Sequence, residues 1–211
     1  MIVSLTGFMG CGKSSVGRKL SELLCCPFMD LDQVIEECAG RTITEIFSQD
    51  GEPAFRQMEL ETLKCIAEGS MPMYSRDPLP LRGPLPLTGG GKMSLPYNRQ
   101  TATEDILSEE KAVLALGGGA VMTRECEDIV RGETVCVYLK ASVETLLEHL
   151  EGEAEGRPML RAEKSGELRE RIENLMTIRS ATYERTAHII IDTDGKSIDE
   201  IAMEIKEAIQ L

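Results

Sequence analysis

The sequence lacks tryptophan and has few aromatic residues of any kind, with four tyrosines and four phenylalanines among 211 residues. Its core must therefore be mainly aliphatic. Basic residues are also scarce, because 23 lysines and arginines face 36 aspartates and glutamates, which gives a formal net charge of −13. This charge disfavours binding to nucleic acids and anionic membrane surfaces. A site for an anion must then be built from a few placed cations.

Long apolar runs and cysteine motifs are missing as well. No stretch of about 18 consecutive apolar residues occurs, and the N-terminus has neither the basic segment nor the cleavage site of a signal peptide. The seven cysteines show no C-x-x-C or Cys/His spacing, so we expect reduced thiols. We therefore expect a cytoplasmic, monomeric protein that folds as one domain over residues 1–211.

The sequence is organised around a glycine-rich stretch near its start. Residues 7–14 read Gly-Phe-Met-Gly-Cys-Gly-Lys-Ser, between an apolar run at 1–5 and a helical pattern at 14–24. This is the G-x-x-x-x-G-K-[ST] form of a phosphate-binding loop, or P-loop, in which backbone N–H groups face a polyphosphate. Lys13 would reach the outer phosphates, and Ser14 would ligate Mg²⁺. The predicted nucleotide-binding residues are Gly10, Cys11, Gly12, Lys13, Ser14 and Ser15.

Short apolar runs alternate with helical patterns along the rest of the chain. Strands are predicted at residues 1–5, 27–29, 112–116, 134–139 and 188–192. Helices are predicted at 14–24, in three pieces between 34 and 68, from 120 onward, and at 143–150, 167–185 and 197–209. This alternation predicts an α/β fold with three layers, in which a five-stranded parallel sheet has helices on both faces.

Three segments are predicted to modify this plan. Residues 31–68 form a small helical substrate-binding sub-domain. Residues 70–104 hold six of the nine prolines and Gly89-Gly90-Gly91, and they are predicted to be an insertion at the end of the sheet away from the site. Residues 151–166 form a polar loop, a candidate lid that would bring Arg157 over the transferring phosphate.

Two aspartates follow the second predicted strand. Ligands bind at the carboxyl ends of strands in open parallel sheets. One of Asp30 and Asp32 could therefore serve the water shell of a metal, while the other meets an acceptor hydroxyl. The alternative is that these residues only cap the next helix.

Two arginines and a triple glycine are candidates for holding the acceptor. Arg56 and Arg179 could grip a carboxylate, since a guanidinium donates two parallel hydrogen bonds; the alternative is two solvated surface arginines. Residues 117–119 are all glycine, which would let a substrate approach the backbone closely. A simple tight turn is the alternative.

Six motifs together resemble the shikimate kinases, which have the nucleoside-monophosphate-kinase-like P-loop fold. The resemblance spans nearly the whole chain apart from residues 70–104. The motifs are Gly-Phe-Met-Gly-Cys-Gly-Lys-Ser at 7–14, Phe-Met-Asp-Leu-Asp at 28–32, Gly-Glu-Pro-Ala-Phe-Arg-Gln-Met-Glu at 51–59, Leu-Gly-Gly-Gly-Ala-Val at 116–121, Gly-Arg-Pro-Met-Leu at 156–160 and Arg-Ser-Ala-Thr-Tyr at 179–183. The resemblance implies ATP-dependent phosphorylation of the shikimate 3-hydroxyl, toward chorismate and the aromatic amino acids.

The resemblance also implies a role for each site residue. Asp32 would orient or deprotonate the acceptor hydroxyl, Asp30 would hold Mg²⁺ through water, and Ser14 would ligate it directly. Lys13 and Arg157 would neutralise the phosphoryl group. The shikimate-binding residues would be Asp32, Arg56, Gly118, Gly119 and Arg179, with Glu59 holding Arg56.

Some positions depart from the family pattern. Ala115 stands where a hydroxyl residue is common in the family. No basic residue around residues 148–150 matches the one that often stacks near adenine. We therefore predict the residues around adenine at 192–196 instead. Cys11, near Lys13, could be a reactive thiol or a small residue that the loop tolerates. The alternative functions are a kinase for another carboxylated metabolite, such as gluconate, or a non-catalytic nucleotide-binding regulator.

Overall fold

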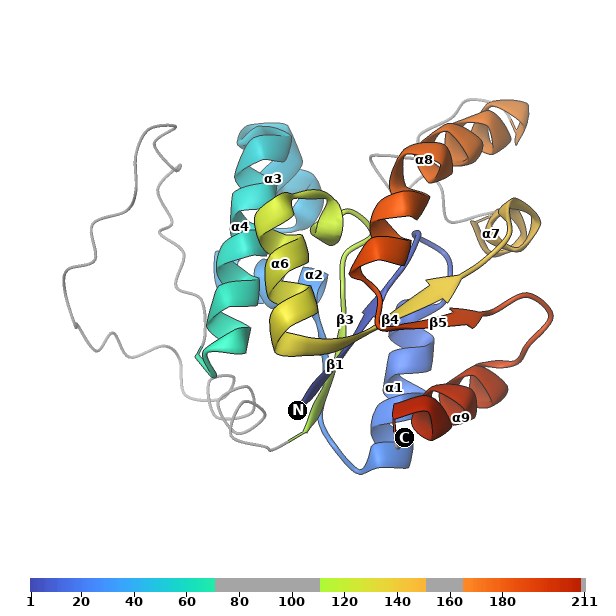
Figure 1. Cartoon of the computed structure of the whole chain (residues 1–211). Coiled ribbons are helices and arrows are strands. Elements are labelled where there is room, and N and C mark those ends of the chain that lie inside the picture. Colours follow the sequence, from blue (N-terminus) through green and yellow to red (C-terminus); the bar gives the residue numbers. More distant parts are fainter. Residues whose placement is uncertain (71–110, 151–164, 210–211) are drawn as a thin grey trace.

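A five-stranded parallel sheet forms the centre of the computed structural model, which describes residues 1–70, 111–150 and 165–209 (Figure 1). The strand order is β2-β3-β1-β4-β5. The strands are β1 (Ile2–Thr6), β2 (Phe28–Asp30), β3 (Ala112–Ala115), β4 (Thr134–Lys140) and β5 (Ile189–Asp192). The predicted five-stranded parallel sheet is confirmed, with the strand before the P-loop at its centre.

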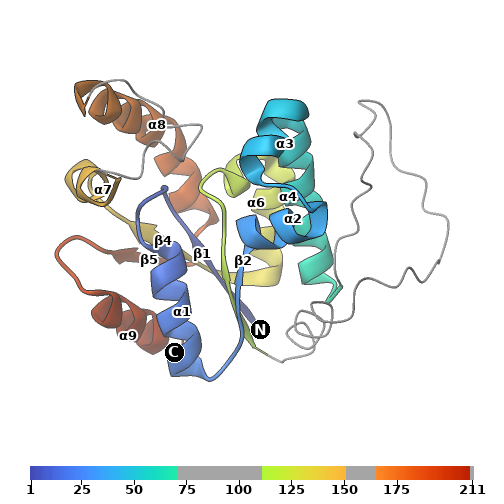
Figure 2. The same ribbon diagram turned by 180° about the vertical axis from the view of Figure 1, so that it is seen from behind.

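Helices cover both faces of the sheet. Figure 2 shows α1 (Lys13–Leu24) and α9 (Ile198–Ile209) side by side on one face. On the other face, α6 (Arg124–Glu133) and α8 (Ser165–Thr186) pack against β4. A short 3-10 helix, η1 (Ala120–Met122), precedes α6. The predicted three-layer α/β architecture is therefore confirmed.

Three helices between β2 and residue 70 stand beside the carboxyl ends of the strands, as predicted for residues 31–68. They are α2 (Leu31–Ala39), α3 (Ile43–Gln49) and α4 (Gly51–Ala67). A capping box starts α3. The Thr42 hydroxyl accepts a hydrogen bond from the backbone N–H of Glu45, and the Glu45 carboxylate accepts one from the backbone N–H of Thr42. One boundary differs from the expectation, since Asp32 lies in the first turn of α2 rather than at the strand end.

The core is mainly aliphatic, as the composition predicts, and two tyrosines are among its few aromatic members. Leu5, Val113 and Leu139 on the central strands are fully buried. Tyr138 on β4 and Tyr183 on α8 are also buried, with ring centroids 5.2 Å apart. Among the residues described, no helix is both long enough and apolar enough to traverse a bilayer.

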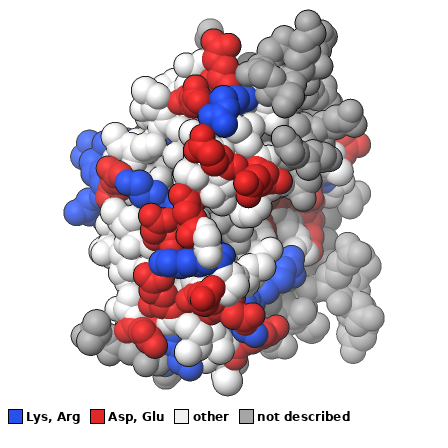
Figure 3. Space-filling model, turned by 90° about the vertical axis from the view of Figure 1, so that its right-hand side faces the viewer, with Lys and Arg blue, Asp and Glu red and all other residues white. Residues whose placement is uncertain are grey.

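Charged side chains of both signs are mixed on the side of the molecule shown in Figure 3. Several basic residues of the chain are paired with acidic ones, such as Lys140 with Glu184 at 3.0 Å and Lys196 with Glu204 at 2.6 Å. The described residues on this face form no continuous basic surface.

The predicted insertion and lid fall outside the described residues, apart from Ser70, Ser165 and Gly166 at their edges, so Arg157 has no position here. The strand that follows the insertion starts at Ala112, which pairs with Ile2 at the start of β1. The P-loop leaves the opposite end of β1. Ala112, where the described chain resumes as a strand, therefore lies at the end of the sheet away from the P-loop.

Candidate active site

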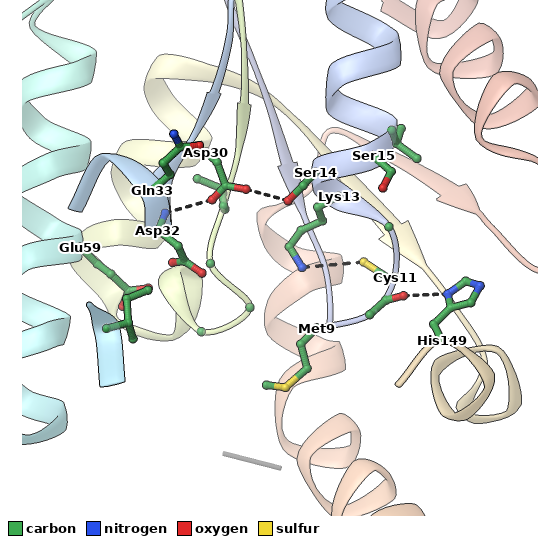
Figure 4. A pocket seen from close by; sticks show the side chains of 18 of the residues that line it. Met9, Cys11, Lys13, Ser14, Ser15, Asp30, Asp32, Gln33, Glu59 and His149 are labelled. Carbon is green, nitrogen blue, oxygen red and sulfur yellow. Dashed lines mark hydrogen bonds between the residues drawn. The ribbon is translucent and has the colours of Figure 1, made fainter. Parts of the chain in front are cut away.

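A cavity of about 1250 Å³ opens at the carboxyl ends of the strands, between the P-loop and helices α2 to α4. One wall is formed by residues 9–16, His149, Thr193, residues 196–198 and Ile201. The other wall includes Asp30, Asp32, Phe47, Phe55, Arg56, Glu59, residues 116–119 and Arg179. Figure 4 shows the two walls facing each other, with Lys13 and Cys11 on one side and Asp32 and Glu59 on the other. The cavity is large enough for two small substrates.

The P-loop curls because three of its glycines adopt left-handed or extended positive φ values. These are Gly7 (φ 143°), Gly10 (φ 85°) and Gly12 (φ 88°), and Gly12 is also the N-cap of α1. Lys13 in the first turn of α1 bends back, and its Nζ donates to the carbonyl oxygens of Gly7 and Phe8, each at 2.9 Å. The loop thus presents a helix N-terminus and a lysine at one place, which suits a phosphate.

Cys11 belongs to the P-loop wall of the cavity, and its thiol packs beneath the loop. Its side chain is buried, with 3% exposed, and its Sγ is 3.9 Å from Lys13 Nζ. A β-carbon at Gly7 would come within 2.8 Å of this sulfur, so the thiol fills the space under the loop. Reactive cysteines are partly exposed, so the structure favours the packing interpretation of Cys11.

Two hard oxygen donors meet beside the P-loop. Ser14 Oγ donates to Asp30 Oδ2 at 2.6 Å, and Asp30 Oδ1 accepts from the backbone N–H of Asp32 at 3.1 Å (Figure 4). Asp30 is therefore a helix cap and also a partner of the P-loop serine, so the cap does not exclude the predicted role at a metal. A hydroxyl and a carboxylate fit Mg²⁺, which takes few protein ligands and completes its shell with water and phosphate oxygens. No cluster of three or more ligating side chains occurs in the described ranges.

Asp32 is a carboxylate held in a poorly solvated place. Burial, with repulsion from Asp30, raises its pKa to about 6, although Lys13 and Arg56 oppose the shift. Its Oδ1 is buried and has no hydrogen-bond partner within the described part of the chain. A buried, unpaired acceptor atom beside a cavity is available to a ligand hydroxyl.

The glycine at position 117 is required by the carboxylates beside it. A β-carbon there would lie 2.7 Å from Asp32 Oδ1 and 2.9 Å from Glu59 Oε1, closer than side chains approach. The triple glycine is therefore more than a tight turn, because its backbone packs directly against the acidic groups of the site.

Arg56 is fixed by two glutamates on its own helix. Its Nη1 donates to Glu59 Oε2 at 2.6 Å, and its Nη2 donates to Glu52 Oε1 at 2.9 Å. Glu59 is 1% exposed, and burial raises its pKa to about 7 against the attraction of Arg56. A β-carbon at Gly119 would come within 2.5 Å of Arg56 Nη1. Arg56 is thus a held side chain and not a solvated surface arginine.

Arg179 reaches the same glycines from the opposite side. It is 6% exposed, and its Nη1 donates to the Gly118 carbonyl at 3.4 Å. The alternative of a solvated arginine therefore fails here too. The structure brings together the predicted residues of both walls within the described ranges; Arg157 alone lies outside them.

Several cavity residues were not predicted from the sequence. Phe47 on α3 and Phe55 on α4 have ring centroids 4.9 Å apart and line the acceptor wall. His149 Nδ1 is 2.8 Å from the Gly10 carbonyl oxygen, at the tip of the P-loop. Adjacency of Phe55 to Arg56 was the available signal for one of these; the sequence holds no sign of the His149 contact. Of the residues predicted around adenine, Thr193 and Lys196 do line the cavity.

Comparison with known proteins gives a consistent result. The family model described as "Shikimate kinase" matches residues 9–71 and 88–210. A shikimate kinase of Dictyoglomus turgidum is 35% identical over 210 residues, covering 99% of this chain and 96% of that protein. One of Thermus thermophilus is 35% identical over 97% of this chain and 88% of that protein.

Solved structures agree. Shikimate kinase from Acinetobacter baumannii, in complex with shikimate, has 27% identity and a TM-score of 0.75, covering 99% of this chain and 92% of that one. Shikimate kinase from Bacteroides thetaiotaomicron has a TM-score of 0.74 at 24% identity, covering 100% and 99%, and supports the fold alone. The chain belongs to the shikimate kinase family.

Proposed function

We propose that this chain transfers the terminal phosphoryl group of ATP to the 3-hydroxyl of shikimate. The observation that carries the proposal is the two-walled cavity. A P-loop lies on one side, and a carboxylate with two held arginines lies on the other. Both substrates can then meet at Lys13 and Asp32, away from most of the solvent.

The nucleotide is assigned to the P-loop wall. The backbone of residues 10–15 would bind the phosphates, and Lys13 would leave its two loop carbonyls to contact them. Ser14 and Asp30 would hold Mg²⁺, which supplies charge neutralisation when bound. Arg157 is proposed as a second phosphoryl-neutralising cation, which an Arg157→Ala variant tests by loss of kcat.

The acceptor is assigned to the opposite wall. Arg56 and Arg179 would bind the carboxylate of shikimate by charge-assisted hydrogen bonds. The backbone of Gly118 and Gly119 would contact its ring substituents. The unpartnered Asp32 Oδ1 would accept the hydrogen bond of the 3-hydroxyl and then its proton as the new P–O bond forms.

A coupled assay of ADP release tests the assignment. Shikimate should support turnover that depends on both ATP and Mg²⁺, while gluconate at the same concentration should not. Gluconate is the right comparison because it also offers a carboxylate to the two arginines. Turnover with gluconate and none with shikimate would refute the proposed acceptor, and no turnover with either would favour a non-catalytic nucleotide-binding protein.

We also propose that the chain works as a monomeric, single-domain enzyme in the cytoplasm. The described residues proposed to bind the two substrates all line one cavity of this chain. Light scattering during gel filtration, in the presence and absence of both substrates, tests the monomer directly.

A further inference from the structure

Tyr183 is the last residue of the Arg-Ser-Ala-Thr-Tyr motif, and its hydroxyl lies within the site region without a role so far. It stands one helical turn after Arg179 on α8, and its side chain is fully buried. Its hydroxyl donates to the carbonyl oxygen of Gly118. Burial raises the pKa of this hydroxyl, although the neighbouring Arg179 guanidinium lowers it by its charge and a hydrogen bond, so the hydroxyl stays protonated and remains a donor throughout the working pH range.

Two donors from one helix therefore share one carbonyl oxygen. The Tyr183 hydroxyl donates to it, while Arg179 Nη1 approaches to only 3.4 Å. Arg179 is the weaker partner, because hydrogen bonds weaken at this separation. If Tyr183 did not satisfy this carbonyl, the arginine would be its remaining donor among the described residues, and withdrawing the arginine would leave this acceptor without a partner there.

Gly118 also lies directly against the P-loop. A β-carbon at this position would be 3.3 Å from the backbone nitrogen of Met9 and 3.7 Å from the Gly7 carbonyl oxygen. The carbonyl that Tyr183 holds thus belongs to a residue packed between α8 and the phosphate cradle. Movement of Gly118 would change the spacing between the two substrates.

We propose that Tyr183 is a positioning residue whose hydroxyl occupies the Gly118 carbonyl, so that Arg179 is free to bind the carboxylate of the acceptor. The inference rests on the proposed function, in that it takes Arg179 to be an acceptor-binding residue. It adds that two residues of the same helix have different partners: Tyr183 binds the backbone carbonyl of Gly118, and Arg179 binds the acceptor.

Tyr183→Phe tests this with little change in shape, because the ring keeps its packing on Tyr138. Without the hydroxyl, Arg179 must serve Gly118 as well as the acceptor. We expect KM and Kd for shikimate to rise about five- to tenfold, the loss of roughly one hydrogen bond. The KM for ATP should stay within about twofold, and kcat within about threefold, because the hydroxyl touches neither substrate.

Tyr138→Phe is the matched control. It removes the other hydroxyl of the same buried ring pair, which lies near Ser180 rather than Gly118. We expect unchanged shikimate affinity in this variant, with a similar small loss of melting temperature in both. Equal losses of shikimate affinity in both variants would reduce Tyr183 to a packing residue and overturn the proposal.

The background variant Arg179→Ala separates this inference from the function it rests on. Arg179→Ala should weaken shikimate binding, and adding Tyr183→Phe should then cost little more, since no arginine is left to be diverted. If Arg179→Ala has no effect on shikimate, the proposed function is wrong at this residue. If it has an effect but Tyr183→Phe has none, only the present inference fails.

A crystal structure of the unmodified chain with shikimate gives a test that does not depend on any variant folding. The expected result is a Tyr183 hydroxyl still bonded to the Gly118 carbonyl and an Arg179 turned onto the carboxylate. Finding Arg179 still on the carbonyl, or Tyr183 away from it, would overturn the proposal.

Discussion

Asp32 illustrates how a single residue is prepared for chemistry at a cost in stability. Its Oδ1 is buried without a partner among the described residues, and its neighbours Asp30 and Glu59 add negative charge nearby. Lys13 and Arg56 offset only part of this. A carboxylate in such a place is poorly satisfied until a hydroxyl donor arrives.

Asp32→Asn should therefore remove most of the catalytic rate while leaving nucleotide binding intact. The amide keeps the shape of the side chain but cannot accept the proton of the acceptor hydroxyl. We expect kcat to fall about 100-fold or more, with Kd for ATP within about threefold of the unmodified chain. Steady-state kinetics and calorimetric titration with ATP measure the two quantities. Asp128→Asn, at an exposed carboxylate on α6, is the control and should change neither.

The same substitution should raise stability at neutral and alkaline pH. The pKa of Asp32 rises from its ordinary 3.8 to about 6 in the folded chain, so the folded state binds this proton more tightly than the unfolded state does. Its contribution is therefore favourable at low pH and is lost as pH increases between these values. A shift of this size corresponds to roughly 1–3 kcal/mol.

Thermal denaturation in EDTA, without nucleotide, measures this effect. Asp32→Asn should melt about 2–6 °C above the unmodified chain at pH 8, and the difference should vanish near pH 4. A variant that is less stable at pH 8 would mean that Lys13 and Arg56 stabilise the ionised carboxylate more than burial penalises it.

At the scale of elements, the loop between β3 and η1 is where the acceptor wall is assembled. Its three glycines are in contact with different groups: Gly117 with two carboxylates, Gly118 with the P-loop backbone, and Gly119 with the guanidinium of Arg56. Helix α4 supplies that guanidinium and α8 supplies Arg179. The loop thus determines how closely the guanidinium groups of Arg56 and Arg179 can approach each other.

Gly119→Ala should displace Arg56 without unfolding the chain. The added methyl group would lie 2.5 Å from Nη1 of a long side chain, which can swing away, and Gly119 does not need a positive φ. We expect KM for shikimate to rise about tenfold, as after loss of a charge-assisted hydrogen bond, with KM for ATP unchanged.

Gly132→Ala on α6 is the matched control, because nothing lies within 4 Å of its added methyl group. It should leave both KM values unchanged and stabilise the helix by up to about 1 kcal/mol. An unchanged shikimate KM in Gly119→Ala would show that the position of Arg56 does not limit acceptor binding.

For the whole molecule, local patterns were enough to predict the sheet and most of the acceptor wall. The spacing of its glycines, lysine and serine predicts the P-loop, and motifs beside predicted strands and helices predict Asp32 and Arg56 as site residues. The contacts that escaped prediction join segments far apart in sequence. His149 meets Gly10, 139 residues away, and Tyr183 meets Gly118, 65 residues away. No local periodicity encodes such meetings, because they depend on how the layers pack.

Replacing residues 72–87 by a short Gly/Ser linker should leave catalysis nearly unchanged. The family model passes over this stretch, and Ala112, where the chain re-enters the sheet, lies at the end opposite the P-loop. We expect kcat and both KM values within about twofold of the unmodified chain. A loss of kcat above tenfold, with the melting temperature preserved, would assign the stretch a part in the reaction.

Lys13 bends onto the carbonyls of Gly7 and Phe8, so its ammonium group is hydrogen-bonded within the loop before any phosphate binds. Nucleotide entry is then an exchange, in which two intramolecular hydrogen bonds are surrendered as phosphate contacts form. The affinity for ATP therefore depends on the difference in free energy between the Lys13 bonds to phosphate and the Lys13 bonds to the loop carbonyls. A ligand without a phosphate for Lys13 to bind has no such bonds to replace those it would break. When adenosine binds alone, Lys13 should therefore stay on the carbonyls of Gly7 and Phe8. The ligand-free loop thus discriminates between nucleotides by the length of their phosphate chain.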